Sequence, residues 1–517
     1  MDDSNPDSIA WVNLVAWVQK HGGLVDGRLV LRSEEPKAAT TYRGVFASAP
    51  IPNGALLISV PGNLSINGHS MPCTYHTGER RAASCWLRTL AAFLQAKKTV
   101  TSESPISWTP YLQSLPTTYE TLWCWNESEL EVLKGVQSPT VPISSSTTAS
   151  WKINRQELET RFRQIIHPYF QSVGFPDIEF DSFAEVCQLV STRGFHDILT
   201  QAEGDHGRSA PGPYLLPVID LLNHGEGPAI ATSLHRNKNG DFVMVAERSI
   251  DSGEEILHSY GPQLTSSQFL ATFGFVPTSH SVNSTAHNLL LADSVTPSAV
   301  IALSKDKDIA GACYSIIADT QAIDDLAESI LSRDPLAEVW EIPSATTRVR
   351  QEIGDDDDVI FLDPTALREE TSQLSDELVT AFCRPFLPDC ARDELTSNTL
   401  LDSSMLQDPF LGKLVGKAMI LLADRKLASY GKVCITESEQ KALPDKDNPC
   451  NDIQLLSTLL QMPSLTVQQE RFKYALTVRL QEMRAFVILQ RKGEQLVESL
   501  DEPSNQHKRR RVESAGD

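Results

Sequence analysis

Two regions of strand character, separated by a long helical stretch, restrict the fold of this sequence more than any other feature. In the first region, residues 29–31, 45–47 and 56–60 are short apolar runs divided by turn residues such as Gly44 and Gly54. Short apolar runs bounded by glycine and asparagine are typical of strands joined by tight turns. The first region therefore predicts a small sheet.

The stretch from about residue 80 to 200 instead predicts helices. Apolar side chains recur at helical spacing over residues 86–95 and 158–170. Strand character returns over residues 214–276, where an apolar run at 215–219 is followed by others that lead to Tyr260. This order predicts one β-rich fold divided by a helical insertion.

Helices are also expected at both ends of the chain. Residues 9–21 have an approximately helical apolar face made by Val12, Val15, Trp17 and Val18. Beyond residue 310 the chain is mostly helical, and its clearest helix covers residues 468–490, with Phe472, Leu476, Leu480, Met483 and Val487 three or four positions apart. The predicted fold class is α+β, with an N-terminal helix at 1–24, a β-rich domain at 25–277 containing a helical insertion at about 75–200, a helical domain at 278–497 and a disordered basic tail at 498–517.

The composition favours a protein partner over nucleic acid. Hydrophobic residues make up 41% of the chain, as in a globular protein, and the formal net charge is −22. A protein that grips phosphate backbones needs a basic face, whereas an acidic protein attracts basic protein substrates. No apolar run approaches the roughly 20 residues of a membrane span, and the acidic N-terminus is unlike a secretory signal. We expect an intracellular monomer without direct nucleic-acid or membrane binding.

The nine cysteines are scattered and do not predict a metal site. They form no C-x-x-C pair and no zinc-ligand spacing with histidine pairs. For an intracellular chain we expect reduced, mostly buried thiols and no metal.

Four short motifs occur in order on the two sides of the helical insertion. They are Arg43-Gly44-Val45-Phe46-Ala47, followed by Ile51-Pro52-Asn53-Gly54; Ser191-Thr192-Arg193-Gly194-Phe195; Pro217-Val218-Ile219-Asp220-Leu221-Leu222-Asn223-His224; and Gly253-Glu254-Glu255-Ile256, followed by Ser259-Tyr260-Gly261 and Phe273-Gly274-Phe275-Val276. Each motif alone is compatible with an ordinary turn or core segment, but the ordered set is specific.

This set resembles the SET methyltransferases over about residues 25–277. The division by a helical insertion resembles the Rubisco large-subunit methyltransferase group, which also includes ribosomal-protein lysine methyltransferases and the actin histidine methyltransferase. The resemblance implies S-adenosylmethionine as cofactor, a protein substrate and a helical C-terminal domain that binds it.

The resemblance also implies a cofactor site made by Tyr42, Arg43, Gly44, Arg193, Asn223, His224 and Tyr260. A glycine permits close backbone approach, an asparagine can donate to and accept from a heterocycle, and a guanidinium suits a carboxylate. Each residue also has a structural alternative: Gly44 and Asn223-His224 as turn residues, Arg193 in an ion pair, and Tyr260 in the core. Phe195 is expected to pack beneath Arg193.

Tyr260 is the expected catalytic residue, and Arg193, Asp220 and Phe273 are expected near the substrate. In the family, the tyrosine at this place lines the methyl-transfer channel, where a neutral nitrogen must be positioned against the methyl group. Asp220 can alternatively order the turn before Asn223 as a hydrogen-bonded cap.

Three positions depart from the family pattern. Tyr42 stands where the family has glycine, Phe273 where many relatives have tyrosine, and Ser266 where relatives often have asparagine. The expected function is a protein-lysine N-methyltransferase acting on a ribosomal, translation-associated or other non-histone protein. Histidine or histone-lysine methylation is the alternative, and an inactive SET-like scaffold is the alternative from another class.

The polar tail contains the basic cluster His-Lys-Arg-Arg-Arg at residues 507–511. Such a cluster is either a nuclear import signal or a solubilising end. We therefore expect the protein in the nucleus, the cytoplasm or both.

Overall fold

The computed structural model describes two large parts of the chain, one β-rich and one helical. The described residues are 6–34, 42–77, 79–83, 85–98, 106–116, 119–133, 136, 159–160, 162–195, 213–261, 264, 266–278, 290–291, 360–361, separate positions between 406 and 430, and 466–501. Within them, no helix is both long enough and apolar enough to cross a membrane.

The largest sheet has six strands in the order β1-β4-β12-β11-β13-β10. Their bounds are β1 Leu24–Val25, β4 Leu56–Val60, β12 Phe242–Ala246, β11 Thr232–Arg236, β13 Leu257–His258 and β10 Asn223–His224. The β10–β13 and β11–β13 pairs are parallel, whereas the other pairs are antiparallel. Because Asn223 pairs with Leu257 and His224 with His258, two segments far apart in sequence lie side by side at this edge.

A hairpin of β2 (Leu29–Glu34) and β3 (Tyr42–Ala47) packs against the segment that precedes β13. The Ala47 amide donates to the Glu254 carbonyl at 2.8 Å, and the Ile256 amide donates to the Val45 carbonyl at 2.7 Å. These bonds bring Gly44 to the edge formed by β10 and β13.

The insertion is mostly helical, as predicted, but it begins with a hairpin. The helices that the structure describes in the insertion are α2 Cys85–Lys98, α3 Thr109–Ser114, η4 Leu122–Cys124, α4 Glu127–Glu131, the π-helix η5 Phe162–Ile166, α6 His167–Ser172 and α7 Phe180–Arg193. The hairpin is β6 (Thr74–Thr77) paired with β7 (Glu79–Ala82), so the helical insertion expected at about 75–200 has two strands at its start. A further small sheet joins β5 (Ile66–Asn67), β9 (Tyr214–Leu215) and β8 (Gly194–Phe195).

One hydrophobic core joins the sheets to the insertion. Strand β12 alternates as a half-buried strand should, burying Phe242, Met244 and Ala246. In the insertion the core is aromatic, with Phe162 and Phe183 ring centroids 4.9 Å apart. The insertion is therefore part of the main core, not a separate unit.

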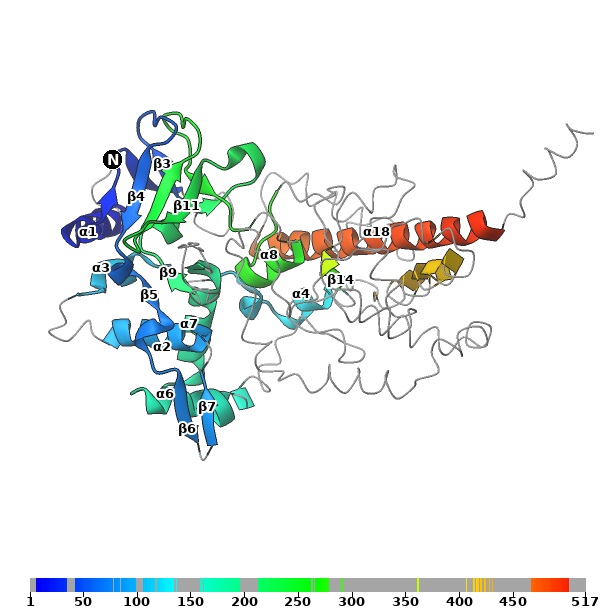
Figure 1. Cartoon of the computed structure of the whole chain (residues 1–517), viewed down its shortest axis with the longest axis horizontal. Coiled ribbons are helices and arrows are strands. Elements are labelled where there is room, and N and C mark those ends of the chain that lie inside the picture. The colour runs from blue at the N-terminus through cyan, green and yellow to red at the C-terminus, as the bar shows by residue number, and fades with distance from the viewer. Residues whose placement is uncertain are drawn as a thin grey trace, which may run out of the picture.

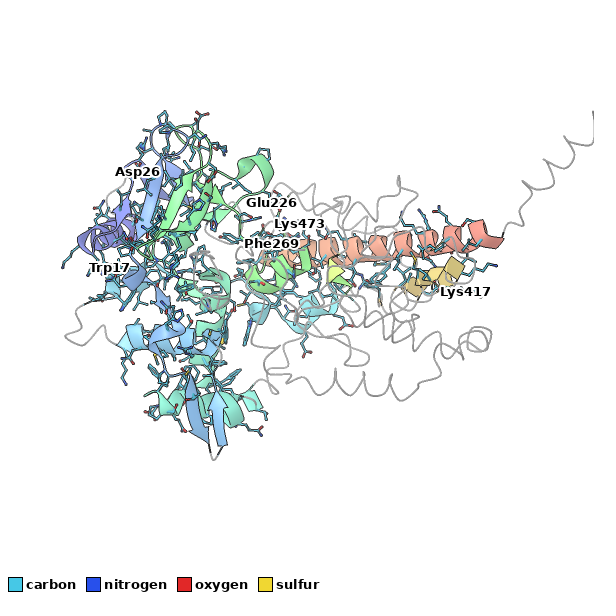
Figure 2. All side chains as sticks on the ribbon, viewed as in Figure 1. Trp17, Asp26, Glu226, Phe269, Lys417 and Lys473 are labelled. Atoms are coloured by element: carbon cyan, nitrogen blue, oxygen red, sulfur yellow. The ribbon has the colours of Figure 1, made fainter. Side chains whose placement is uncertain are left out.

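The helix α18 (Val467–Asp501) confirms the predicted C-terminal helix and extends it by eleven residues at the C-terminal end. Its first half packs with α4 and with α8 (Ser266–Phe273) in a second core that includes Leu270, Phe472 and Leu476. In Figure 1 it runs away from the β-rich part, and in Figure 2 Lys473 on α18 and Phe269 on α8 lie near the end where the two parts meet. Near the other end of α18, Gly416 approaches the backbone of Gly493.

Several details differ from the sequence-based expectations. Helix α1 (Pro6–Lys20) buries Trp11, Leu14, Trp17 and Val18, whereas Val12 is 63% exposed, so the predicted apolar face was partly wrong. The i, i+3, i+6, i+7 set follows the 3.6-residue period more closely than the predicted set.

Two segments assigned strand character are not strands. The run at 215–219 leaves the sheet after Leu215, because Pro217 lacks an amide donor and the chain then enters the 3-10 helix η6 (Ile219–Leu221). Residues 266–273 form α8, with Phe269, Leu270 and Phe273 at helical spacing.

The cysteine prediction was also partly wrong. All four described cysteines are free, as expected, but Cys73 and Cys124 are exposed and Cys187 is buried. Beyond residue 278, the short pair of β14 (Leu290–Leu291) and β15 (Ile360–Phe361) adds strands to a region expected to be helical. The basic cluster at 507–511 lies outside the described residues.

Candidate active site

Tyr260 follows β13 and is held by the neighbouring segment around β10. Its hydroxyl donates to the Leu222 carbonyl at 3.0 Å, and its backbone amide donates to His224 Nδ1 at 3.1 Å. Since His224 Nδ1 accepts this bond, a neutral His224 carries its proton on Nε2, which lies 3.6 Å from Glu226 Oε1. Both the ring and the main chain of Tyr260 are thereby fixed.

Aromatic side chains surround Tyr260. Ring centroids lie 4.8 Å away for Phe273, 5.0 Å for His258 and 5.2 Å for His224. Burial raises the pKa of Tyr260 to about 12, so the hydroxyl keeps its proton at neutral pH. The arrangement holds a neutral phenol in an apolar wall that includes Phe273, one of the predicted substrate-side residues.

Asn223 links three segments at the sheet edge. Its side-chain amide donates to the Arg43 carbonyl and to Glu255 Oε1, each at 2.8 Å. A Cβ atom at Gly44 would overlap Glu255 Oε1 and press on Asn223. Gly44 therefore leaves room for the hydrogen bond between Asn223 and Glu255, a role beside the close ligand approach expected from sequence.

Arg193 and Asp220 meet where α7 ends and η6 begins. Arg193 Nη1 donates to the Asp220 backbone carbonyl at 2.5 Å, and Tyr111 on α3 donates its hydroxyl to Asp220 Oδ2 at 2.7 Å. Burial raises the pKa of Asp220 to about 6, although Arg193 and Arg43 oppose this shift. The Arg43 guanidinium is turned toward α3, where Nη2 donates to the Ser114 carbonyl at 2.7 Å.

The backbone is strained two residues before Asp220. Val218 has a φ of 73°, and it is the one described residue other than glycine with a positive φ. A β-branched residue in this region is a steric outlier that costs roughly 1–3 kcal/mol. The outlier directly precedes η6, so the main chain is bent at the point that presents Asp220.

His258 is a buried neutral histidine at the centre of the edge. Its ring stacks on Phe195 at 5.7 Å, and burial lowers its pKa to about 3. The contact with His258 adds a partner to Phe195, and the expected packing of Phe195 beneath Arg193 stays a prediction.

The structure brings together the predicted residues Arg43, Gly44, Arg193, Asp220, Asn223, His224, Tyr260 and Phe273. Tyr42 is the first residue of β3 and pairs with Glu34, while its side chain lies outside the described part. Ser266 is buried at the start of α8. In the described residues, no group of His, Cys, Asp and Glu side chains could hold a metal ion.

Sequence reasoning missed Tyr111, Glu255 and His258. Glu255 belongs to a motif that was recognised, but its contact with Asn223 depends on the pairing of distant strands. Tyr111 is 109 positions from its partner Asp220, and one tyrosine in a short helix gives no signal by itself. The histidine two positions before Tyr260 was a signal in the sequence that could have found His258.

Comparisons with known proteins agree with this geometry. Residues 42–261 match the family model of the SET domain. The chloroplastic [fructose-bisphosphate aldolase]-lysine N-methyltransferase of Arabidopsis thaliana is 23% identical over 281 residues, covering 53% of this chain and 53% of that protein. The N-lysine methyltransferase setd6 of Salmo salar is 25% identical over 281 residues, covering 51% and 56%. The chain therefore spans about half the length of these curated relatives.

Solved structures of similar fold align with nearly the whole length of the chain. A crystal structure of the SET domain of LSMT bound to lysine and AdoHcy has a TM-score of 0.51 and 16% identity, covering 97% of this chain and 95% of that chain. A structure of Rubisco LSMT bound to AdoMet has a TM-score of 0.50 and 16% identity, covering 99% and 97%. The fold, the family-model match and the ordered motifs agree: residues 42–261 match the SET-domain family, and the α+β fold is similar to that of the LSMT structures.

Proposed function

We propose that this chain is a protein-lysine N-methyltransferase that uses S-adenosylmethionine. The observation that carries the proposal is the convergence of Gly44, Arg193, Asp220, Asn223 and Tyr260 from distant segments of the SET region. Two of the relatives that match this region bear the names of lysine N-methyltransferases.

The donors and acceptors of this region suit S-adenosylmethionine. Among the described residues, the buried Nε atoms of Arg43 and Arg193 have no hydrogen-bond partner. A guanidinium N–H suits the carboxylate of the cofactor, whereas the Asn223 side-chain oxygen is an acceptor suited to an N–H group. When bound, the cofactor supplies a methyl group activated by a sulfonium.

The residues of the chain position the other reactant and exclude water. A lysine must be neutral to attack, and an apolar channel lowers the pKa of its amine by disfavouring the ammonium. Tyr260, Phe273 and His258 supply such a wall. Because the Tyr260 hydroxyl donates to Leu222, its oxygen lone pairs remain as acceptors for groups beside it.

A basic protein is the proposed substrate class, and the net charge of −22 supports it. The proposed recognition element is the helical region after residue 310, because one lysine side chain offers too little area for discrimination. The rate on a protein substrate should fall as salt rises, while cofactor affinity should be nearly constant. A rate that is independent of salt would argue against charge-driven recognition.

Two experiments test the proposed activity, first cofactor binding and then methyl transfer. Calorimetry with S-adenosylmethionine should show a single saturable site. Incubation of the protein with labelled cofactor and a proteome from cells lacking it should then label a protein, and mass spectrometry should find methyl-lysine. Absence of cofactor binding by the folded chain would reject the enzyme and favour a SET-like scaffold, and label on histidine would reject lysine as the target.

We also propose that the basic cluster at 507–511 directs nuclear import. The sequence of the cluster supports this proposal. Deleting residues 505–517 should move a fluorescent fusion from nucleus to cytoplasm without changing cofactor affinity. A fusion that stays nuclear after the deletion would contradict the proposal.

A further inference from the structure

Residues 216–222 connect two sheets of the β-rich part. The connection starts after β9, which pairs with β8, and β8 begins directly after Arg193. It ends at β10, which pairs with β13, and Tyr260 lies two positions after β13. The path of this connection therefore affects Arg193 and Tyr260 together.

The connection bends sharply at Val218. This residue has a φ of 73° and a ψ of −47°, close to the classic γ-turn, which is rare and strained. After the bend, the Asp220 amide donates to the Leu216 carbonyl at 3.0 Å, and the Leu222 amide donates to the Ile219 carbonyl at 3.2 Å. These bonds fix the path of the main chain as far as the start of β10.

The side chain of Val218 holds the bend in place. It is fully buried in the same core as Leu216, Ile219 and Leu222. A strained backbone persists only where its surroundings determine it strongly. Glycine adopts a positive φ without strain, but it has no side chain to fill the core and would leave the bend free to change conformation. The valine therefore fixes the bend by packing, at a cost in backbone strain.

Two main-chain carbonyls beyond the bend contact residues of the candidate site. The Asp220 carbonyl accepts from Arg193 Nη1 at 2.5 Å, and the Leu222 carbonyl accepts the Tyr260 hydroxyl at 3.0 Å. Because a phenol has only one proton, the bond to Leu222 sets the directions in which the lone pairs of the hydroxyl oxygen face. A shift of the Leu222 carbonyl would therefore turn the acceptor side of Tyr260.

We propose that Val218 is a positioning residue for methyl transfer: its buried side chain holds the strained bend, and the bend places the Leu222 carbonyl where it orients the Tyr260 hydroxyl. The inference rests on the proposed function for the reaction, since Tyr260 is the proposed catalytic residue. Val218 acts on the reaction only through Leu222 and Tyr260.

The first test compares stability at two buried valines. Val60 on β4 is the matched control, because it is also fully buried in this core and its φ is not positive. Val60→Ala should be more stable than Val60→Gly, because glycine weakens a strand. At position 218 the order should invert, because alanine keeps the Cβ atom that strains the bend and glycine does not. The same order at both positions, by urea midpoints of the full chain, would overturn the inference.

The second test measures the rate of label transfer to a proteome from cells lacking the protein, at saturating labelled cofactor and equal amounts of folded chain. Val218→Gly should be about tenfold slower than the wild type, because the reacting groups are misplaced. Val60→Gly should keep the wild-type rate. In a Tyr260→Phe chain, adding Val218→Gly should lower the residual rate by less than about twofold, because the hydroxyl through which Val218 acts is already absent.

The third test observes Tyr260 directly and does not depend on activity. In the full chain labelled with tyrosine carrying carbon-13 at Cζ, the Tyr260 signal is the one that Tyr260→Phe removes. Cζ bears the hydroxyl, so its nuclear magnetic resonance shift should change in Val218→Gly and stay unchanged in Val60→Gly.

An unmoved Tyr260 signal in Val218→Gly, or independent losses of rate in the double variant, would overturn the inference while leaving the proposed function intact. A wild-type chain that transfers no methyl group would instead reject the proposed function, and with it any role of Val218 in the reaction. The Tyr260 signal would then still decide whether Val218 orients the hydroxyl.

Discussion

Two clusters in this protein place an arginine beside acidic groups, and they are completed differently. In the β-rich part, Arg193 donates to the main chain of Asp220 and leaves one carboxylate oxygen without a partner. Where α18 meets the insertion, Arg471 bonds Glu120 at 2.6 Å and the buried Glu129 at 3.0 Å. Glu129 also accepts from the Asn126 amide in a capping box, so its carboxylate is fully used.

The difference separates a cluster suited to binding a ligand, at Asp220, from a cluster that stabilises the fold, at Arg471. This ion-pair network uses the carboxylates of Glu120 and Glu129 to hold α18 against η4 and α4, although the buried Nε of Arg471 has no hydrogen-bond partner among the described residues. An incomplete cluster, next to a strained Val218, keeps a buried acceptor available at a cost to stability. Changes in the first cluster should therefore alter folding, and changes in the second should alter binding and rate.

The largest effect is expected from Tyr260→Phe. Methyl transfer should fall about 100-fold or more, because the hydroxyl acts on the reacting groups, while cofactor affinity should change less than twofold. Steady-state rates and calorimetry measure the two quantities. Tyr430→Phe is the control from the helical part, where the hydroxyl donates to Glu482 at 2.6 Å, and its cofactor affinity should be unchanged. Wild-type turnover in Tyr260→Phe would remove Tyr260 from the mechanism.

Arg471→Ala should give the largest loss of stability. It leaves Glu129, which is 2% exposed, without its cation, and the free energy of unfolding should fall by about 3 kcal/mol. Urea denaturation measures this loss. In the control Arg163→Ala, the pair with Glu159 is lost on the surface, where the Arg163 side chain is 74% exposed, and the change should stay below about 0.5 kcal/mol. Equal effects in the two variants would contradict the structural role of the Arg471 cluster.

Asn223→Ala and Arg193→Ala should each weaken cofactor binding by about 1–3 kcal/mol, because a buried polar partner is lost. Calorimetry measures the effect, and circular dichroism checks that both variants fold. Asn237→Ala removes a side chain whose bonds lie within its own turn, including one to Asp241 at 3.0 Å, and it should bind the cofactor normally. Unchanged affinity in both site variants would mean that the cofactor binds elsewhere.

At neutral pH the smallest effect is expected from His258, because its contribution to stability changes only as the protein is acidified. Its folded-state pKa of about 3 lies below the usual 6.5, so the folded state binds fewer protons than the unfolded state below pH 6.5. His258 should therefore stabilise the fold above about pH 6.5, and this contribution should be lost as pH falls, by about 1.4 kcal/mol per pH unit.

Asp220 changes the stability in the opposite direction. Its pKa is raised from 3.8 to about 6, so its contribution to the free energy of unfolding is lost as the pH rises through 6. The difference in unfolding free energy between the wild type and His258→Gln isolates the histidine. An identical pH dependence in the two proteins would show that His258 is not held neutral by burial.

The sequence predicted the parts of the fold that depend on local pattern. The alternating apolar residues of β12 and the long periodicity of α18 were found because each element carries its own signal. The division of the β-rich fold by an insertion was also predictable, since the pattern changes twice. By contrast, the strand expected after Leu215 ends because of Pro217 and the strained Val218, and strain is set by tertiary contacts.

The candidate site was predictable by resemblance for Tyr260, Asn223 and Arg193, but their partners were not. The bond from Asn223 to Glu255 depends on the register of β10 against β13, and the bond from Tyr111 to Asp220 joins two helices 109 positions apart. No periodicity in the chain encodes such pairs. Sequence reasoning thus predicted reacting and binding groups, and the structure adds the hydrogen-bond partners of these residues.

Methyl transfer from labelled S-adenosylmethionine to a protein lysine, compared between the wild type and Tyr260→Phe in one proteome, tests the central claim most directly. The wild type should yield a labelled protein whose methylated residue is a lysine by mass spectrometry, and Tyr260→Phe should bind the cofactor equally well but leave that lysine unlabelled. A wild-type chain that binds S-adenosylmethionine and labels no protein, or a Tyr260→Phe chain that labels the same lysine at the wild-type rate, would contradict it.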